Sequence, residues 1–288
     1  MNEKVYLNGN LVERDRALIP VLDYGFLYGY GLFETMRAYG GKVFRIEQHL
    51  KRLQDSAKIL GIKIDLKTLR NAVNDTLNVN KIDSARVRVT LSPGLGEINA
   101  NLDTCTYTTT MVIAEKYPPF PERIYRNGFK AITSSLIINS QSWFSGLKST
   151  SYLLNVLARK EARAAGADEA ICLNEKGLLA EASMSNIFLV DDDRLKTPAL
   201  NNGILPGITR RTVIELAIKM GIECKEVDIT ADELYQSQEA FLTNSLIEIM
   251  PLSKLDNKQI GKGRIGNITE NLLIEYRKLV SKDLGGCN

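Results

Sequence analysis

The chain has 288 residues, of which 44% are hydrophobic and 25% charged, which is the composition of an ordinary soluble globular protein. Its 37 basic and 34 acidic residues are mixed along the sequence and leave a formal net charge of +3, so there is no basic stripe of the kind that binds nucleic acid. No apolar run approaches the roughly 20 residues of a membrane helix, and the first residues contain no apolar signal core. We therefore expect a cytoplasmic protein with no nucleic-acid or membrane partner.

Cysteine and histidine usage excludes several kinds of site. The four cysteines lie far apart and form no C-x-x-C pair, which argues against a disulfide framework or a zinc site. The single histidine, His49, excludes metal sites built from two or three histidines. We expect no metal, and we interpret His49 as a partly buried structural residue on the apolar face of a helix.

The first part of the chain predicts two β-hairpins followed by helices and strands. The first hairpin turns at Asn8-Gly9 and the second at Gly40-Gly41. Apolar spacing predicts helices over residues 46–60 and 66–77, and strands in "ARVRVTLSPG" and "TYTTTMVIAEKY". The stretch "YPPFPER", at residues 117–123, holds three of the eight prolines and is the best candidate for a linker.

The second part mixes strands and helices in irregular order. Strands are predicted in "EAICLN" and "SNIFLV", a helix in "GITRRTVIELAIKMG", and a last helix over residues 268–280. Thr230 and Glu233 have the spacing of a capping box at the start of a short helix. Because strands and helices do not alternate regularly, the order favours an α+β fold over a βαβ array.

Lys148 is the first candidate for chemistry. The apolar spacing that follows it predicts a helix whose start Ser149 or Thr150 could cap, which leaves Lys148 at or just before the helix N-terminus. The helix dipole disfavours a cation there. A neutral lysine amine is the nucleophile that attacks a carbonyl cofactor or substrate. Taken alone, however, a lysine is most often a solvated surface charge.

Three other places allow a functional and a structural interpretation. Glu181 lies among apolar and small residues, so it is either a partly buried carboxylate that needs a cationic partner or a charge at a hairpin edge. Thr209 follows "GILPG" at a helix start, which suits either an anion site or simple capping. Arg86 and Arg88 share one face of a strand and could bind a carboxylate or form a solvated edge.

Five motifs in order resemble one family. They are "HLKRL", "GLKSTSYLLNVLARKEA", "EASMSNIFLV", "GILPGITR" and "TNSLIEIMPL", and the resemblance covers nearly the whole chain. The chain resembles the class IV aminotransferases, which are fold-type IV pyridoxal-phosphate enzymes. The family includes branched-chain amino acid aminotransferases, D-amino acid aminotransferases and aminodeoxychorismate lyases.

The resemblance implies a role for each candidate residue. Lys148 matches the catalytic lysine that carries pyridoxal 5'-phosphate and then shuttles a proton. Glu181 matches the acid that pairs with the pyridine nitrogen of the cofactor, and Asn186 could support it. The remaining cofactor-binding residues that the motifs imply are Arg52, Ile208, Thr209 and Ser245 around the phosphate, and Tyr152 beside the phenolic oxygen.

The resemblance also implies the architecture. It predicts two α/β domains with the cofactor in the cleft between them, and a homodimer or higher homo-oligomer. We expect a smaller N-terminal domain over residues 1–117, a linker over residues 118–130 and a larger C-terminal domain over residues 131–288.

The motifs point in two directions within the family. "FETMR" has Thr35 where branched-chain enzymes typically carry glycine, which favours the lyase or the D-amino acid group, and "TNSLIEI" also looks like some lyases. The run after Lys148 looks like the transaminase form, and Arg37 is unlike typical D-amino acid enzymes. We expect a transaminase, with lyase or D-amino acid aminotransferase as alternatives and a non-catalytic cofactor-binding protein as the least favoured.

The expected substrate residues are Tyr28, Phe33, Arg37 and Arg88. Phe33, Thr35 and Arg37 alternate along one strand and so share a face. An apolar wall with an arginine suits transfer of an amino group from a branched-chain or other aliphatic amino acid to 2-oxoglutarate in a ping-pong reaction. Arg37 with Arg86 or Arg88 could instead bind the carboxylates of aminodeoxychorismate.

Overall fold

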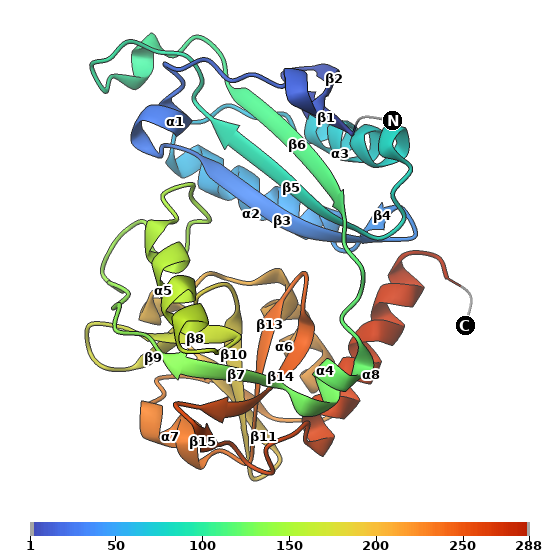
Figure 1. Ribbon diagram of the computed structural model, residues 1–288, viewed down its shortest axis with the longest axis vertical. Helices are drawn as coiled ribbons and strands as arrows, with labels where there is room; N and C mark the ends of the chain where they lie inside the picture. Colours follow the sequence, from blue (N-terminus) through green and yellow to red (C-terminus); the bar gives the residue numbers. More distant parts are fainter. Residues whose placement is uncertain (1–2, 287–288) are drawn as a thin grey trace. The chain divides into compact units, whose positions relative to one another are not determined.

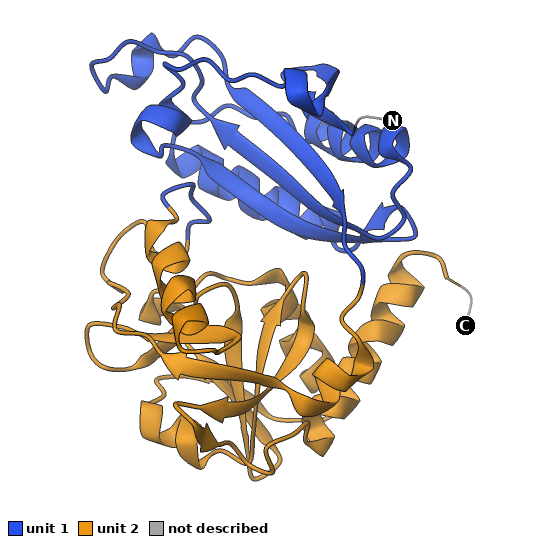
Figure 2. Cartoon of the chain, viewed as in Figure 1, with its two compact units in different colours: residues 1–118, 147–151 blue, residues 119–146, 152–288 orange. Residues whose placement is uncertain are grey.

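The computed structural model describes residues 3–286. The chain forms two compact units, which are coloured separately in Figure 2. Unit 1 comprises residues 1–118 and 147–151, and unit 2 comprises residues 119–146 and 152–288. Each unit combines helices with a mainly antiparallel sheet, so the predicted α+β fold is confirmed.

Unit 1 is a six-stranded sheet in the order β2-β1-β6-β5-β3-β4, with α2 and α3 packed against one face (Figure 1). Its elements are β1 (Lys4–Leu7), β2 (Asn10–Glu13), η1 (Arg14–Arg16), α1 (Tyr24–Tyr28), β3 (Leu32–Tyr39), β4 (Lys42–Val43), α2 (Ile46–Ile59), α3 (Leu66–Asn80), β5 (Ala85–Ser92), η2 (Leu102–Thr104) and β6 (Thr109–Lys116). The predicted hairpins at Asn8-Gly9 and Gly40-Gly41 are confirmed as the β1–β2 and β3–β4 pairs.

The alternation of β3 explains how unit 1 carries both a core and a polar face. Leu32, Met36 and Ala38 are fully buried and join the core that the sheet forms with α2 and α3. Side chains two residues apart on a strand point the same way. Glu34 therefore lies on the helix-covered face, and Phe33 and Arg37 lie on the opposite face.

Unit 2 is built on a nine-stranded sheet in the order β12-β11-β10-β13-β14-β7-β8-β9, with β15 paired to β14. Its elements are α4 (Glu122–Asn127), β7 (Phe129–Thr133), α5 (Leu153–Ala164), β8 (Glu169–Leu173), β9 (Leu179–Ala182), β10 (Asn186–Asp191), β11 (Arg194–Pro198), η3 (Leu200–Asn202), α6 (Ile208–Lys219), β12 (Cys224–Val227), α7 (Ala231–Gln236), β13 (Glu239–Asn244), β14 (Glu248–Leu255), β15 (Lys258–Gln259) and α8 (Asn267–Asp283). Helix α5 packs against β8, whereas α6 and α8 pack against β13, and α8 also contacts β14.

Two boundaries differ from the expected domain limits. The segment 118–130, expected to be a linker, contains α4 and the start of β7, and residues 119–130 belong to unit 2. Residues 147–151, expected in the second domain, belong to unit 1. The predicted capping box of Thr230 and Glu233 is confirmed at the start of α7.

Two further expectations concern cysteines and membranes. Within residues 3–286 the cysteines Cys105, Cys172 and Cys224 are free thiols, and Cys287 lies outside the described residues. No helix in the same range is long and apolar enough to cross a membrane.

Candidate functional site

Lys148 is held in unit 1 by backbone pairing with the start of β3. The backbone N–H of Phe33 donates to the carbonyl of Lys148 at 2.8 Å, and Leu32 forms an isolated bridge with Ser149. The N–H of Thr150 donates to the carbonyl of Gly31 at 2.9 Å. Glycine is needed at position 31 because an added Cβ would lie 2.9 Å from the Thr150 hydroxyl and 2.6 Å from the carbonyl oxygen of Leu91.

The predicted helix start after Lys148 is wrong. Helix α5 begins at Leu153, its N-cap is Tyr152, and no side chain caps it. Ser149 and Thr150 do not cap the helix because the backbone of this segment pairs with residues 31–33, and the Thr150 hydroxyl donates to the carbonyl of Gly29 at 2.8 Å. The dipole of α5 therefore cannot be the reason for a lysine at this position.

The Lys148 side chain lies instead against an aromatic ring. Its Nζ is 4.6 Å from the centroid of Phe33, and the guanidinium carbon of Arg88 is 3.8 Å from the same centroid. A cation over a ring face is attracted by the ring quadrupole. The structure thus brings together three residues that were predicted separately, Lys148, Phe33 and Arg88, on one part of unit 1.

The other arginines of this strand face have different surroundings. Arg37 is 3% exposed, and its guanidinium carbon lies 4.7 Å from the ring centroid of Tyr39 and 5.3 Å from that of Tyr117. Arg86 forms an ion pair with Glu115 on β6. Arg88, rather than Arg86, is therefore the arginine of β5 that accompanies Lys148. Tyr28 ends α1, where it is partly exposed and packs edge-on against Tyr24.

Arg52 is anchored on the helix-covered face of the sheet in unit 1. Its Nε and Nη2 each donate to a different carboxylate oxygen of Glu34, both at 2.7 Å. Nδ1 of His49 lies 2.8 Å from Oε2 of Glu34. Burial alone would raise the pKa of Glu34, but the charge of Arg52 and the hydrogen bond from His49 outweigh it and lower that pKa to about 2.

His49 is more buried than predicted, at 2% exposure. Burial lowers the pKa of its imidazole, and the opposing effect of Glu34 only partly offsets this. Because the Glu34 carboxylate is ionised and can only accept, the neutral imidazole donates through its Nδ1–H. Sequence reasoning missed Glu34. The available signal was an acidic residue at an inward position of an apolar strand.

In unit 2, Glu181 is fixed by two donors. Nδ2 of Asn186 donates to its Oε2 at 2.9 Å, and the backbone N–H of Leu205 donates to the same oxygen at 3.0 Å. Asn186 also donates to the carbonyl of Leu205 at 2.9 Å, so one amide joins Glu181 to the loop that precedes α6. This is the supporting contact that the sequence suggested for Asn186.

The start of α6 lies beside this amide. A Cβ added to the N-cap residue Gly207 would be 2.0 Å from Oδ1 of Asn186, so only glycine fits. No side chain caps α6, whose first residues Ile208 and Thr209 are buried. An uncapped helix start presents backbone N–H groups and a partial positive charge, which suits an anion. Glu181, Asn186 and the α6 start thus form one group in unit 2.

Ser245 and Tyr152 are also in unit 2. Ser245 follows β13 in the turn to β14, where the Asn244 side chain accepts the backbone N–H groups of Leu246 and Ile247. The hydroxyl of Tyr152 donates to the carbonyl of Ser183 at 3.4 Å. That carbonyl lies in the turn between β9, which carries Glu181, and β10, which carries Asn186.

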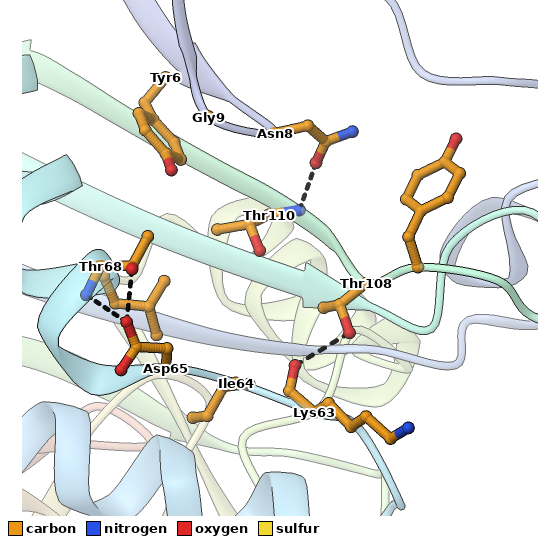
Figure 3. Close-up of a pocket in the computed structure, with 11 residues that line it drawn as sticks. Tyr6, Asn8, Gly9, Lys63, Ile64, Asp65, Thr68, Thr108 and Thr110 are labelled. Atoms are coloured by element: carbon orange, nitrogen blue, oxygen red, sulfur yellow. Dashed lines mark hydrogen bonds between the residues drawn. The ribbon is translucent and has the colours of Figure 1, made fainter.

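A pocket of about 400 Å³ lies elsewhere in unit 1 (Figure 3). Its lining residues are Tyr6, Asn8, Gly9, Lys63, Ile64, Asp65, Thr68, Leu69, Tyr107, Thr108 and Thr110. Figure 3 shows that polar groups in its wall are already hydrogen-bonded to one another, as in Thr108 to the carbonyl of Lys63 and Thr68 to Asp65. None of the predicted site residues lines this pocket.

Comparison with known proteins decides the family. Residues 31–255 match the family described as amino-transferase class IV. The chain belongs to this family. The predicted resemblance is thereby confirmed, and the protein is an enzyme of the aminotransferase class.

Individual relatives cover nearly the whole chain. A protein of Methanocaldococcus jannaschii, named provisionally as a branched-chain-amino-acid aminotransferase, is 38% identical over 97% of this chain and 97% of its own. An aminodeoxychorismate lyase of Bacillus subtilis is 33% identical over 95% of this chain and 94% of its own. A solved branched-chain amino acid aminotransferase with pyridoxamine 5'-phosphate, from the organism abbreviated T.th., matches with a TM-score of 0.93 and 32% identity, covering 98% of this chain and 95% of that one.

Proposed function

We propose that this class IV aminotransferase uses pyridoxal 5'-phosphate to move the amino group of a branched-chain or other aliphatic L-amino acid to 2-oxoglutarate in a ping-pong reaction. The observation that carries the proposal is the placement of Lys148. Backbone pairing with β3 holds its amine 4.6 Å from the Phe33 ring, beside Arg88. The amine can react with the carbonyl carbon of the cofactor. The ring suits an aliphatic side chain of the substrate, and the guanidinium suits a substrate carboxylate.

The described residues fit the cofactor chemically. Pyridoxal phosphate has a carbonyl carbon for an amine, a ring nitrogen for a carboxylate and a phosphate for cations and N–H groups. Lys148 supplies the amine and Glu181 supplies the carboxylate. The N–H groups at the start of α6 and the guanidinium of Arg52 suit the phosphate. When bound, the cofactor supplies the electron sink for cleavage of the Cα–H bond of the substrate.

Two residues act on protons in this proposal. The Nζ of Lys148 would take the proton from the substrate Cα and deliver it to the former carbonyl carbon of the cofactor, as a positioned amine does in general acid–base catalysis. The carboxylate of Glu181 holds the proton of the ring nitrogen. Asn186 and the N–H of Leu205 keep this carboxylate in one orientation, which supports its role as a fixed negative charge.

The phosphate is assigned to backbone and side-chain donors. The backbone N–H groups of Ile208 and Thr209 suit it because no side chain caps α6. The Thr209 and Ser245 hydroxyls and the Arg52 guanidinium complete the proposed set. Tyr152 is assigned to the phenolic oxygen of the cofactor.

The substrate assignment rests on the face of β3 and β5 that lies opposite α2 and α3. Phe33 and Tyr28 offer apolar surface with one hydroxyl, which suits an aliphatic side chain. Arg88 contacts the Phe33 ring and lies opposite Thr35, so it can bind the second carboxylate of glutamate or 2-oxoglutarate. Arg37, which is buried beside the rings of Tyr39 and Tyr117, is the second candidate for that carboxylate.

Aminodeoxychorismate lyase is the alternative, and the 33% identical Bacillus subtilis relative supports it. A substrate panel separates the two activities. Purified protein with pyridoxal phosphate is given L- and D-amino acids with 2-oxoglutarate, and separately aminodeoxychorismate. We expect glutamate formation from leucine, isoleucine and valine. Release of pyruvate and 4-aminobenzoate without any exchange would overturn the proposal in favour of the lyase, and exchange of D-amino acids alone would overturn the assigned enantiomer.

A second experiment tests the assigned lysine. Borohydride reduction of the loaded enzyme is expected to attach the cofactor to the peptide that contains Lys148. Lys148→Ala is expected to lose turnover while still binding the cofactor through its phosphate. Full activity in this variant would remove Lys148 from the mechanism. We also expect a homodimer or higher homo-oligomer, which light scattering on the eluted protein measures directly.

A further inference from the structure

We propose that Glu34 is a positioning residue that aims the Arg52 guanidinium at the cofactor's phosphate, and that His49 fixes Glu34. The inference rests on the proposed function, in which Arg52 binds that phosphate. It adds two residues of unit 1 to the site: Glu34, which lies outside the quoted motifs, and His49, which the sequence analysis interpreted as structural.

Glu34, Arg52 and His49 form one hydrogen-bonded group, which we call the clamp. Arg52 donates to both oxygens of Glu34 through Nε and Nη2, so one side of the planar guanidinium is fixed by two parallel hydrogen bonds. The rigid fork turns Nη1 away from the carboxylate. The Arg52 side chain is 12% exposed, whereas that of Glu34 is 1% exposed, so of these two side chains only the arginine reaches solvent.

The clamp is built on two packed elements. Glu34 belongs to β3, and His49 and Arg52 belong to α2, where a spacing of three residues places them on one face of the helix. Nδ1 of His49 lies 2.8 Å from the Glu34 oxygen that also accepts from Nη2 of Arg52. The carboxylate is therefore held from two sides, and the long arginine side chain loses its freedom before any ligand arrives.

Charge makes the proposal testable. Glu34 offsets the positive charge of Arg52, so a site that needed only charge would bind an anion better without Glu34. A site that needs a correctly oriented guanidinium would bind it worse, because preorganisation lowers the cost of ordering on binding. Replacing Glu34 by glutamine removes the charge and keeps the shape, so the sign of the change in affinity separates the two roles.

The test measures dissociation constants of two probes, pyridoxal 5'-phosphate and pyridoxal, for the apo protein. For Glu34→Gln we expect phosphate-bearing cofactor to bind at least tenfold more weakly and pyridoxal to change less than twofold. A purely structural role would weaken both probes equally. His49→Asn, which keeps a donor near the position of Nδ1, is expected to have a smaller effect than Glu34→Gln.

Two further variants keep the outcome decisive. Glu47→Gln on the same helix breaks the exposed pair with Arg70 and is expected to leave both constants unchanged. If Glu34→Gln does not fold, Glu34→Asp, which retracts the carboxylate but keeps its charge, is expected to show the same selective loss. Unchanged or tighter binding of pyridoxal phosphate in whichever variant folds overturns the inference.

Failure of the inference is distinguishable from failure of the proposed function. If Arg52→Ala weakens pyridoxal phosphate binding but Glu34→Gln does not, Arg52 binds the phosphate without the help of Glu34. If neither variant changes the constant, Arg52 does not bind the phosphate, and that part of the proposed function is wrong.

Discussion

Because the sequence contains one histidine, a single imidazole contributes to the effect of pH on stability near neutrality, and its contribution can be isolated by substitution. His49 is buried against Glu34, and burial lowers the pKa of its imidazole, with Arg52 and Lys148 acting in the same direction and Glu34 against them. The unfolded chain, where the pKa is about 6.5, therefore binds more protons than the folded chain below neutrality. Stability from His49 is fully present above that value and is lost as the pH falls below it.

The magnitude follows from linkage. If His49 stays neutral in the folded state, protonation of this residue in the unfolded chain lowers the free energy of unfolding by about 1.3 kcal/mol when the pH falls from 7 to 5.5. Urea unfolding of the apo protein, followed by circular dichroism at both pH values, measures this loss. His49→Asn lacks this contribution. Between pH 7 and pH 5.5 we therefore expect its free energy of unfolding to fall by about 1 kcal/mol less than that of the wild type.

A direct measurement accompanies the unfolding experiment. The single imidazole gives one Hε1 resonance in the NMR spectrum, and this resonance is expected to titrate at lower pH than that of a free imidazole because burial lowers the pKa of His49. A resonance that titrates near pH 6.5, together with equal losses in wild type and His49→Asn, would refute the reasoning. It would mean that the imidazole is accessible to solvent and not clamped by Glu34.

Three further predictions concern activity and stability. Glu181→Gln is expected to lower turnover at least ~100-fold, the size of effect seen when a well-placed electrostatic group is lost; a variant within twofold of wild type would make Glu181 a surface charge. Gly207→Ala places a Cβ 2.0 Å from Oδ1 of Asn186, so we expect about 1–3 kcal/mol of destabilisation in urea unfolding together with reduced turnover, and wild-type values for both would show that the loop adjusts freely. Phe33→Ala is expected to raise KM for leucine at least tenfold and KM for glutamate less; equal changes for both substrates would remove Phe33 from the aliphatic contact.

Much of the local structure of this chain could be predicted because its causes are local. Asn8-Gly9 and Gly40-Gly41 allow the positive backbone angles that tight hairpins need, and both hairpins are present. The capping pair of Thr230 and Glu233 lies within four residues and starts α7 as expected. Each of these features depends on neighbours in the sequence, which patterns of residues report directly.

The surroundings of Lys148 could not be predicted in the same way. Its spacing to the apolar residues of α5 suggested a capped helix start, yet the segment 147–151 pairs with residues 31–33, which precede it by more than 100 positions. The preference of Ser149 and Thr150 for capping a helix stabilises this segment less than its backbone hydrogen bonds to residues 31–33. A pattern within one segment contains no information about such a distant partner.

The sequence by itself determined which groups this protein has: one lysine in a family motif, a carboxylate in an apolar stretch, a glycine-rich loop before a helix and a single histidine. Only the tertiary structure decided how they are held. Folding placed Phe33 and Arg88 against Lys148, Asn186 against both Glu181 and Gly207, and Glu34 between Arg52 and His49. Such contacts join residues from different elements, and they form because burying apolar surface brings those elements together and leaves each buried polar group in need of a partner.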